Sequence, residues 1–155
     1  MFRALQDFFD EFIAPPPDQT PAGREQALRL AAAVLLVEVM RAKPTMDPAE
    51  RKGVFAALRR RFALSDGEVA ALVELAEAQS KSANDYFHFT SRINDNLSQT
   101  EKNALVESMW KVAYADGVLD TSEIHVISKV AELLHVTHGE YIAAKMRAKE
   151  AAGLA

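Results

Sequence analysis

The chain has no cysteine among its 155 residues. Disulfides, thiolate zinc sites and cysteine nucleophiles are therefore excluded, and only oxygen and imidazole side chains remain as metal ligands. Long hydrophobic runs are also absent: the longest covers residues 30–37 and is far too short to span a bilayer. Residues 1–13 lack the basic start and small-residue cleavage site of a signal peptide. We therefore expect a cytoplasmic protein.

The balance of charge excludes a second group of functions. The chain is 49% hydrophobic and 26% charged, as expected for one soluble globular domain, and its formal net charge is −4. Because the chain is acidic and has no recognisable nucleic-acid-binding motif, we expect no nucleic-acid partner. Bases nevertheless concentrate in residues 41–62, so this stretch is a candidate contact surface for an acidic partner.

Capping boxes, in which a side-chain acceptor is followed three residues later by glutamate, mark five helix starts. They are Asp47/Glu50, Ser65/Glu68, Ser98/Glu101, Asp120/Glu123 and Thr137/Glu140. Apolar residues recur between the boxes at helical spacing, and no stretch alternates like a strand. We expect an all-α, compact bundle of about seven to eight helices, at residues 2–13, 21–43, 48–63, 66–81, 84–95, 99–116, 121–135 and 138–151.

The first expected helix is set apart from the others. Three prolines at 15–17 form a stiff linker that cannot continue it, so we divide the chain into an N-terminal amphipathic helix with its linker, 1–18, and a helical domain, 19–155. The favoured interpretation is that its apolar stripe docks onto the domain. The alternative is an arm for a partner or a membrane surface. The stripe consists of Phe2, Leu5, Phe9 and Phe12.

The domain contains an internal repeat with an offset of 73 positions. Asp47 and Glu50 align with Asp120 and Glu123, and the apolar positions of the preceding helices align at the same offset. After a one-residue gap the starts of the third helices align as well. We expect each unit to consist of a long helix, a second helix and a third helix. The junction between the first two helices carries the acidic residues and is called the acidic corner. The bundle is therefore expected to be built from two pseudo-repeated three-helix units.

The second corner is the candidate metal site. Asp116 lies at a helix C-terminus, where the helix dipole opposes a negative charge by roughly 0.3–1 kcal/mol. Asp120 and Glu123 lie at the start of the next helix. Three carboxylates at one corner suit a hard, oxygen-preferring cation, so the expected ligands are Asp116, Asp120 and Glu123 and the expected ion is Ca²⁺ or Mg²⁺.

The two corners differ at one position. Lys43 stands where the second unit has Asp116, and its ammonium can neutralise the first corner by reaching Asp47 or Glu50. The second unit has no such lysine. The alternative interpretation is that Asp120 and Glu123 only cap their helix and that no metal binds.

The segment 110–117, Trp-Lys-Val-Ala-Tyr-Ala-Asp-Gly, followed by Leu119, Asp120 and Glu123, resembles the bacterial tellurite-resistance TerB-like family. The resemblance covers roughly residues 24–148. It implies a bundle of duplicated three-helix arrays in the bacterial cytoplasm, sometimes in membrane-linked stress-response complexes. It also implies a non-enzymatic protein with divalent-metal ligands at its acidic corners, which here are Asp116, Asp120 and Glu123. The first corner, with Asp47 and Glu50, departs from the family pattern because Lys43 and Pro44 interrupt it.

The expected function is therefore a non-enzymatic, stress-response binding module of the tellurite-resistance type with a divalent-cation site at the second corner. Its expected partner is a protein, with a membrane-associated complex and peripheral attachment to the inner membrane left open. One alternative is a metal-free interaction module that uses the Phe-rich N-terminal helix or the basic helix 48–63. A weaker alternative is a metal-dependent hydrolase, although no local catalytic signature supports it.

Overall fold

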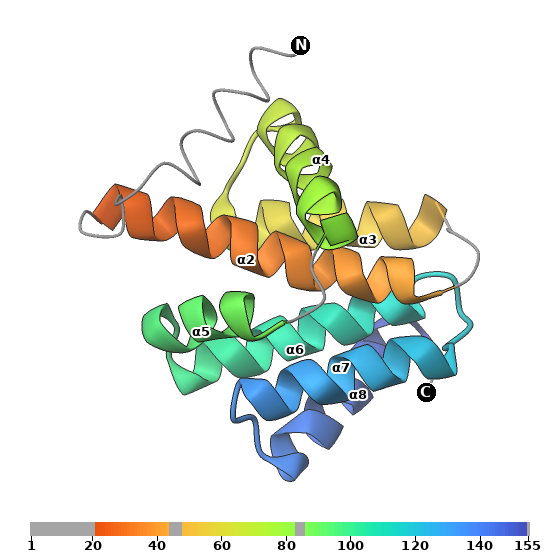
Figure 1. Ribbon diagram of the computed structural model, residues 1–155. Coiled ribbons are helices and arrows are strands. Elements are labelled where there is room, and N and C mark those ends of the chain that lie inside the picture. The colour runs from red at the N-terminus through yellow and green to blue at the C-terminus, as the bar shows by residue number, and fades with distance from the viewer. Residues whose placement is uncertain (1–20, 44–47, 83–85, 155) are drawn as a thin grey trace.

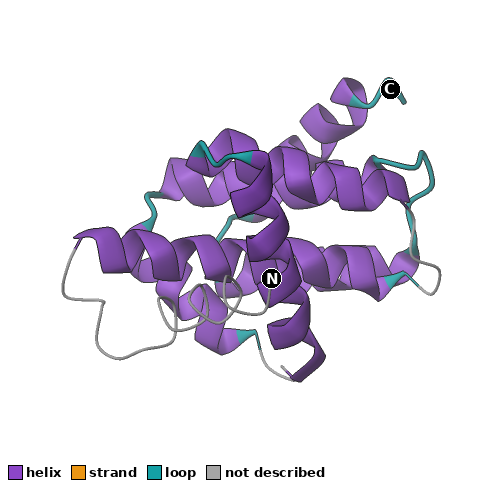
Figure 2. Ribbon diagram, turned by 90° about the horizontal axis from the view of Figure 1, so that it is seen from above, coloured by secondary structure: helices purple, strands orange, loops and turns teal. Residues whose placement is uncertain are grey.

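The computed structural model describes residues 21–43, 48–82 and 86–154, and these residues form seven α-helices (Figure 1). No strand occurs in this part of the chain (Figure 2), so the expected all-α class is confirmed. The expected helix 2–13, the cap Asp47 and the linker 15–17 lie outside the described residues. The helices are α2 (Pro21–Ala42), α3 (Pro48–Phe62), α4 (Asp66–Ser82), α5 (Phe87–Asn96), α6 (Gln99–Tyr114), α7 (Thr121–Leu133) and α8 (His138–Ala151).

Local capping explains where the helices begin. Ser98 and Glu101 form a reciprocal capping box at α6, and Asp120 and Glu123 form another at α7. Thr137 caps α8 by accepting a hydrogen bond from the amide of Glu140. Each side chain satisfies an amide that the first helical turn leaves without a partner. The capping predictions at these three helices are therefore confirmed.

The two units have the same internal arrangement. In the first, α2 packs against α3 and α4, and in the second, α6 packs against α7 and α8. The second helix of each unit ends in the same backbone conformation, because Ala63 after α3 and His135 after α7 have positive φ angles of 53° and 60°. The repeat predicted from the sequence is present in the backbone.

A pseudo-two-fold axis relates the units. The helices α2 and α6 lie side by side with their corners at the same end of the molecule (Figure 1). Across the axis α3 packs on α6, and α7 correspondingly packs on α2. The end of α2 and the start of α3 therefore lie next to the corner between α6 and α7.

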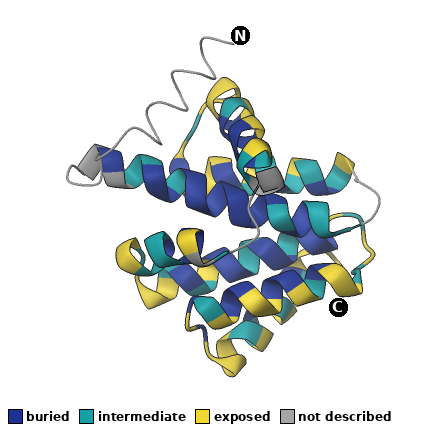
Figure 3. Ribbon diagram, in the orientation of Figure 1, coloured by how far each residue is buried: buried dark blue, intermediate teal, exposed yellow. Residues whose placement is uncertain are grey.

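The core is centred on α2 and α6 (Figure 3). From Ala31 to Val37 every residue of α2 is buried, as expected for a helix that is covered on all sides. Trp110 on α6 is fully buried, and its ring lies against Tyr114 and Tyr141. The aromatic side chains of this segment belong to the core, which leaves the corners as the polar region.

Candidate functional site

Lys43 follows α2 directly and lies between the two corners. Its ammonium donates a hydrogen bond to the carboxylate of Asp116. It lies 3.3 Å from the carbonyl oxygen of Val118 and 3.4 Å from Oε2 of Glu50. The hydrogen bond to Asp116 is the main cause that raises the pKa of Lys43, so the lysine is fully charged at neutral pH.

Asp116 is held as an anion by this contact. Burial works against its ionisation, but the hydrogen bonds from Lys43 and from the amide of Val118 outweigh burial and lower its pKa. The second of these bonds, from Val118 N to Asp116 Oδ1, is 3.0 Å long. Gly117 makes the turn between Asp116 and Val118 with a φ of 83°, in the left-handed region that glycine adopts without strain.

Two glutamates form the floor of the site. Glu50 on α3 and Glu123 on α7 are both fully buried. Glu123 Oε1 accepts a 3.1 Å hydrogen bond from the amide of Asp120. As two carboxylates they would leave Glu50 Oε1 and Glu123 Oε2 with no donor from the residues that the structure describes. Buried acceptors of this kind cost about 1–3 kcal/mol each when they stay unpaired, so a proton or a cation is required between them.

A proton meets this requirement at neutral pH. Burial, followed by the hydrogen bond to Glu123, raises the pKa of Glu50 to about 9. Burial also raises the pKa of Glu123. Since two buried carboxylates in contact cannot both ionise readily, the pair shares one proton, which the pKa of about 9 places on Glu50 as the donor to Glu123.

The pseudo-two-fold axis explains why these residues meet. Lys43 and Asp116 are 73 positions apart, and Glu50 and Glu123 are also 73 positions apart. Residues that lie on a two-fold axis contact their own equivalents. The two acidic corners therefore form one site. The first unit contributes Lys43 and Glu50, and the second unit contributes Asp116 and Glu123.

The structure corrects the expectation that Lys43 neutralises the first corner and leaves Asp116 without a cation. The lysine does reach Glu50, as expected, but it also binds Asp116 across the axis. Glu50 was absent from the expected ligand set, although it shares the site with Asp116 and Glu123. The sequence signal that pointed to Glu50 was its separation from Glu123, which equals the repeat offset of 73 positions.

Asp120 has a different role from Asp116 and Glu123. Its Oδ1 accepts a 2.8 Å hydrogen bond from the amide of Ser122, and it caps α7. Across residues 21–43, 48–82 and 86–154 no group of three His, Asp or Glu side chains forms a ready metal centre. A divalent ion at this site would have to take the place of the Lys43 ammonium and of the proton held by Glu50.

The basic face of α3 is largely occupied by ion pairs within the domain. Arg51 pairs with Glu77 at 2.9 Å, and Arg59 pairs with Asp66 at 2.5 Å. Arg61 pairs with Glu101 of α6 at 3.0 Å. Three of the bases that made residues 41–62 a candidate surface for an acidic partner therefore already have acidic partners in the same chain.

Comparison with known proteins identifies the family of the chain. The model of a family described as tellurite resistance protein TerB matches residues 29–146, which is more than half of the chain. No curated protein and no solved structure shows a significant match. Within the described residues, no helix combines the length and the apolar character needed to cross a membrane.

Proposed function

The chain belongs to the TerB family of tellurite-resistance proteins, and we propose that it is a non-enzymatic binding module whose axial site exchanges the Lys43 ammonium for a divalent cation. The axial site consists of Lys43, Glu50, Asp116 and Glu123. Ca²⁺ and Mg²⁺ are the proposed ions, because every candidate ligand is a carboxylate oxygen. Proteins of a stress-response complex are the proposed partners.

One observation carries the cation proposal. Glu50 Oε1 and Glu123 Oε2 are buried acceptors that no donor of the described residues reaches unless a proton stands between them. Together with Asp116 these groups would carry three negative charges, and among the described residues Lys43 is the one cation that pairs with them. Such a set is stable with a proton and an ammonium, and it also suits a divalent ion, which would neutralise two carboxylates at once.

The exchange would move charge and side chains together. In the cation-bound form Asp116, Glu123 and Glu50 would be ligands, and Asp120 would stay in place as the cap of α7. The ammonium would turn outward, because Lys43 is the first residue after the end of α2. Because Glu50 must lose its proton, we expect the apparent affinity for the cation to increase between pH 7 and pH 9.

Thermal unfolding with and without Ca²⁺ or Mg²⁺ tests the proposal. Lys43→Met removes the internal competitor and keeps the apolar stem of the side chain, so its apparent affinity should exceed that of the wild type. An ion at 100 times its dissociation constant stabilises the folded state by about 2.7 kcal/mol. For a chain of this length this corresponds to an increase in melting temperature of roughly 5–10 °C.

The matched control is Lys52→Met, which removes an exposed lysine of α3 away from the axial site. It should respond to the ions as the wild type does. Glu123→Gln should abolish the response because it removes a ligand charge. If millimolar Ca²⁺ and Mg²⁺ leave the melting temperature of both the wild type and Lys43→Met unchanged, the cation site is refuted.

A metal-free interaction module is the second candidate, and the ion pair between Lys43 and Asp116 favours it. In that case the ammonium of Lys43 permanently occupies the place of a metal ion, and binding of a partner depends on the surface of the module alone. Loss of partner capture on deletion of residues 1–18, with no metal response of the folded protein, would support this candidate over the first.

A further inference from the structure

We propose that the N-terminal segment, residues 2–13, docks into a groove between α2, α3 and α6 and thereby occupies the pseudo-symmetric counterpart of α5. This inference is independent of the cation proposal, because the groove lies away from the axial site. The groove is mainly apolar and encloses about 260 Å³. Its walls include Leu28 and Leu36 of α2, Leu58 and Phe62 of α3, and Leu105 of α6.

The pseudo-two-fold axis identifies what belongs in the groove. The helix α5 precedes the second unit and packs against α2 and α7. The axis exchanges α2 with α6 and α7 with α3, so the corresponding position lies against α6 and α3. These two helices supply most of the groove wall. The element that precedes the first unit, as α5 precedes the second, is the N-terminal segment.

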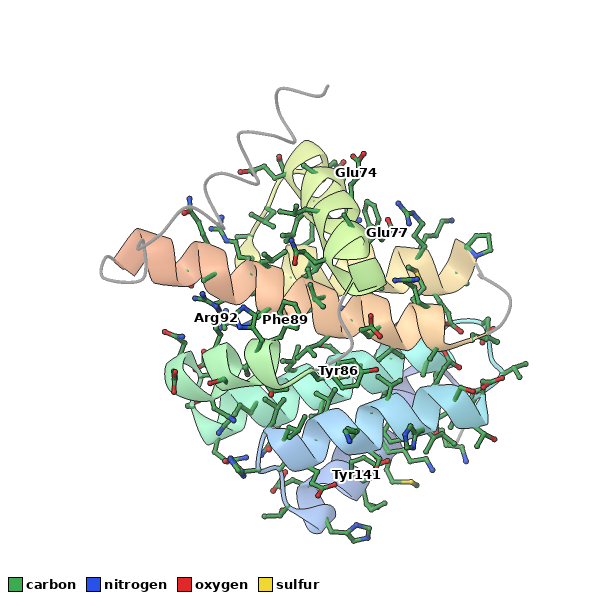
Figure 4. All side chains as sticks on the ribbon, in the orientation of Figure 1. Glu74, Glu77, Tyr86, Phe89, Arg92 and Tyr141 are labelled. Atoms are coloured by element: carbon green, nitrogen blue, oxygen red, sulfur yellow. The ribbon has the colours of Figure 1, made fainter. Side chains whose placement is uncertain are left out.

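The segment has the side chains that this position uses. On α5 the buried residues Phe89 and Ile93 are four positions apart, and Figure 4 shows Phe89 directed from α5 toward α2. In the N-terminal segment Phe9 and Ile13 have the same spacing. Residues four positions apart share one face of a helix, so a helix lying over the groove would direct Phe9 and Ile13 toward it together.

Charge and reach agree with this placement. The rim carries Arg60, Arg61 and Lys111 against two glutamates, and Arg60 has no ion pair among the described residues. The segment supplies three acids, Asp7, Asp10 and Glu11, against one base. The seven residues 14–20, which join the segment to α2, span roughly 22 Å if extended. Leu28 lies seven residues into α2, about 10 Å along its axis, so the segment can fold back over the groove.

Because the 155-residue chain has no native cysteine, crosslinking between two introduced cysteines gives a clean test. Leu5→Cys with Ala104→Cys places one thiol on the segment and one on an exposed residue of the groove wall. The control pair is Leu5→Cys with Glu132→Cys, an exposed position on α7. With a short bis-maleimide we expect a crosslink within one chain for the first pair at a yield about tenfold above the control pair. A yield no higher than the control, or crosslinks only between two chains, overturns the proposal.

Limited chymotrypsin digestion supplies a measurement that needs no added thiol. The segment contains four phenylalanines, which docking should protect from cleavage. Ala104→Glu places a negative charge on the groove wall and should increase cleavage of the segment about tenfold, because it repels the acids of the segment. Ala56→Glu makes the same change at an exposed position of α3 outside the groove wall and should leave the rate unchanged. Equal rates for the two variants contradict the proposal.

Discussion

The buried proton of the axial site makes the stability of the folded chain depend on pH in a predictable direction. The pKa of Glu50 is about 9 in the folded state against an ordinary value of 4.5. Between these values the folded state holds a proton that the unfolded state has lost. The contribution of Glu50 is therefore complete below pH 4.5, decreases as pH rises, and is lost by about pH 9.

Glu50→Gln tests this dependence because an amide imitates the neutral acid. The side-chain NH₂ can donate to Glu123 Oε2, and the amide oxygen can accept from Lys43. For one proton the wild type loses up to about 1.4 kcal/mol of stability for each pH unit. From pH 6 to pH 8 this amounts to roughly 2–3 kcal/mol, and the variant should not show this loss. Relative to the wild type, Glu50→Gln should thus gain stability as pH rises.

Urea unfolding at pH 6, 7 and 8 measures the free energy of unfolding directly. The difference between variant and wild type cancels the contributions of groups that titrate alike in both proteins. Glu132→Gln, which changes an exposed glutamate of α7, should keep the pH dependence of the wild type. If Glu50→Gln retains the full pH dependence, or if the wild type has none between pH 6 and 8, the shared proton is refuted.

Two further substitutions probe the backbone of the first unit by thermal unfolding. Ala63→Gly should stabilise the fold by about 1 kcal/mol, because Ala63 has a φ of 53° in the left-handed region where a side chain is strained; a lower melting temperature would show that this strain is negligible. Gly53→Ala should add roughly 0.5–1 kcal/mol of helix stability, since the new Cβ would lie 3.5 Å from Val112 Cα, an ordinary contact. Destabilisation by Gly53→Ala would mean that α3 and α6 cannot adjust at this approach.

The helices could be predicted from the sequence because their determinants are local. Ser98 and Glu101, three residues apart, mark the start of α6 without any knowledge of the rest of the fold. The repeat was visible for the same reason, since alignment of the chain with itself requires no coordinates. Membership of the TerB family followed from the short segment 110–123.

The axial site was only half predictable. Asp116 and Glu123 were identified, but each contacts a residue 73 positions away, and a repeat in the sequence does not show where its symmetry axis lies. The site predicted for the second corner therefore lacked Glu50. The charge balance expected for the second corner also left out the hydrogen bond from Lys43 to Asp116, because this bond depends on how the two units pack. The groove was equally hidden, because three separated helices form its walls.

The contact between Lys43 and Asp116 depends on the two units being parts of one chain. In a homodimer of identical units, a position on the two-fold axis must face a copy of itself, so a charged residue there always meets its own sign. Covalent fusion removes this restriction, because each copy of the position can then change independently. An acid in one copy and a base in the other turn a repulsive self-contact into an ion pair, so the asymmetry between the corners can itself hold the two halves together.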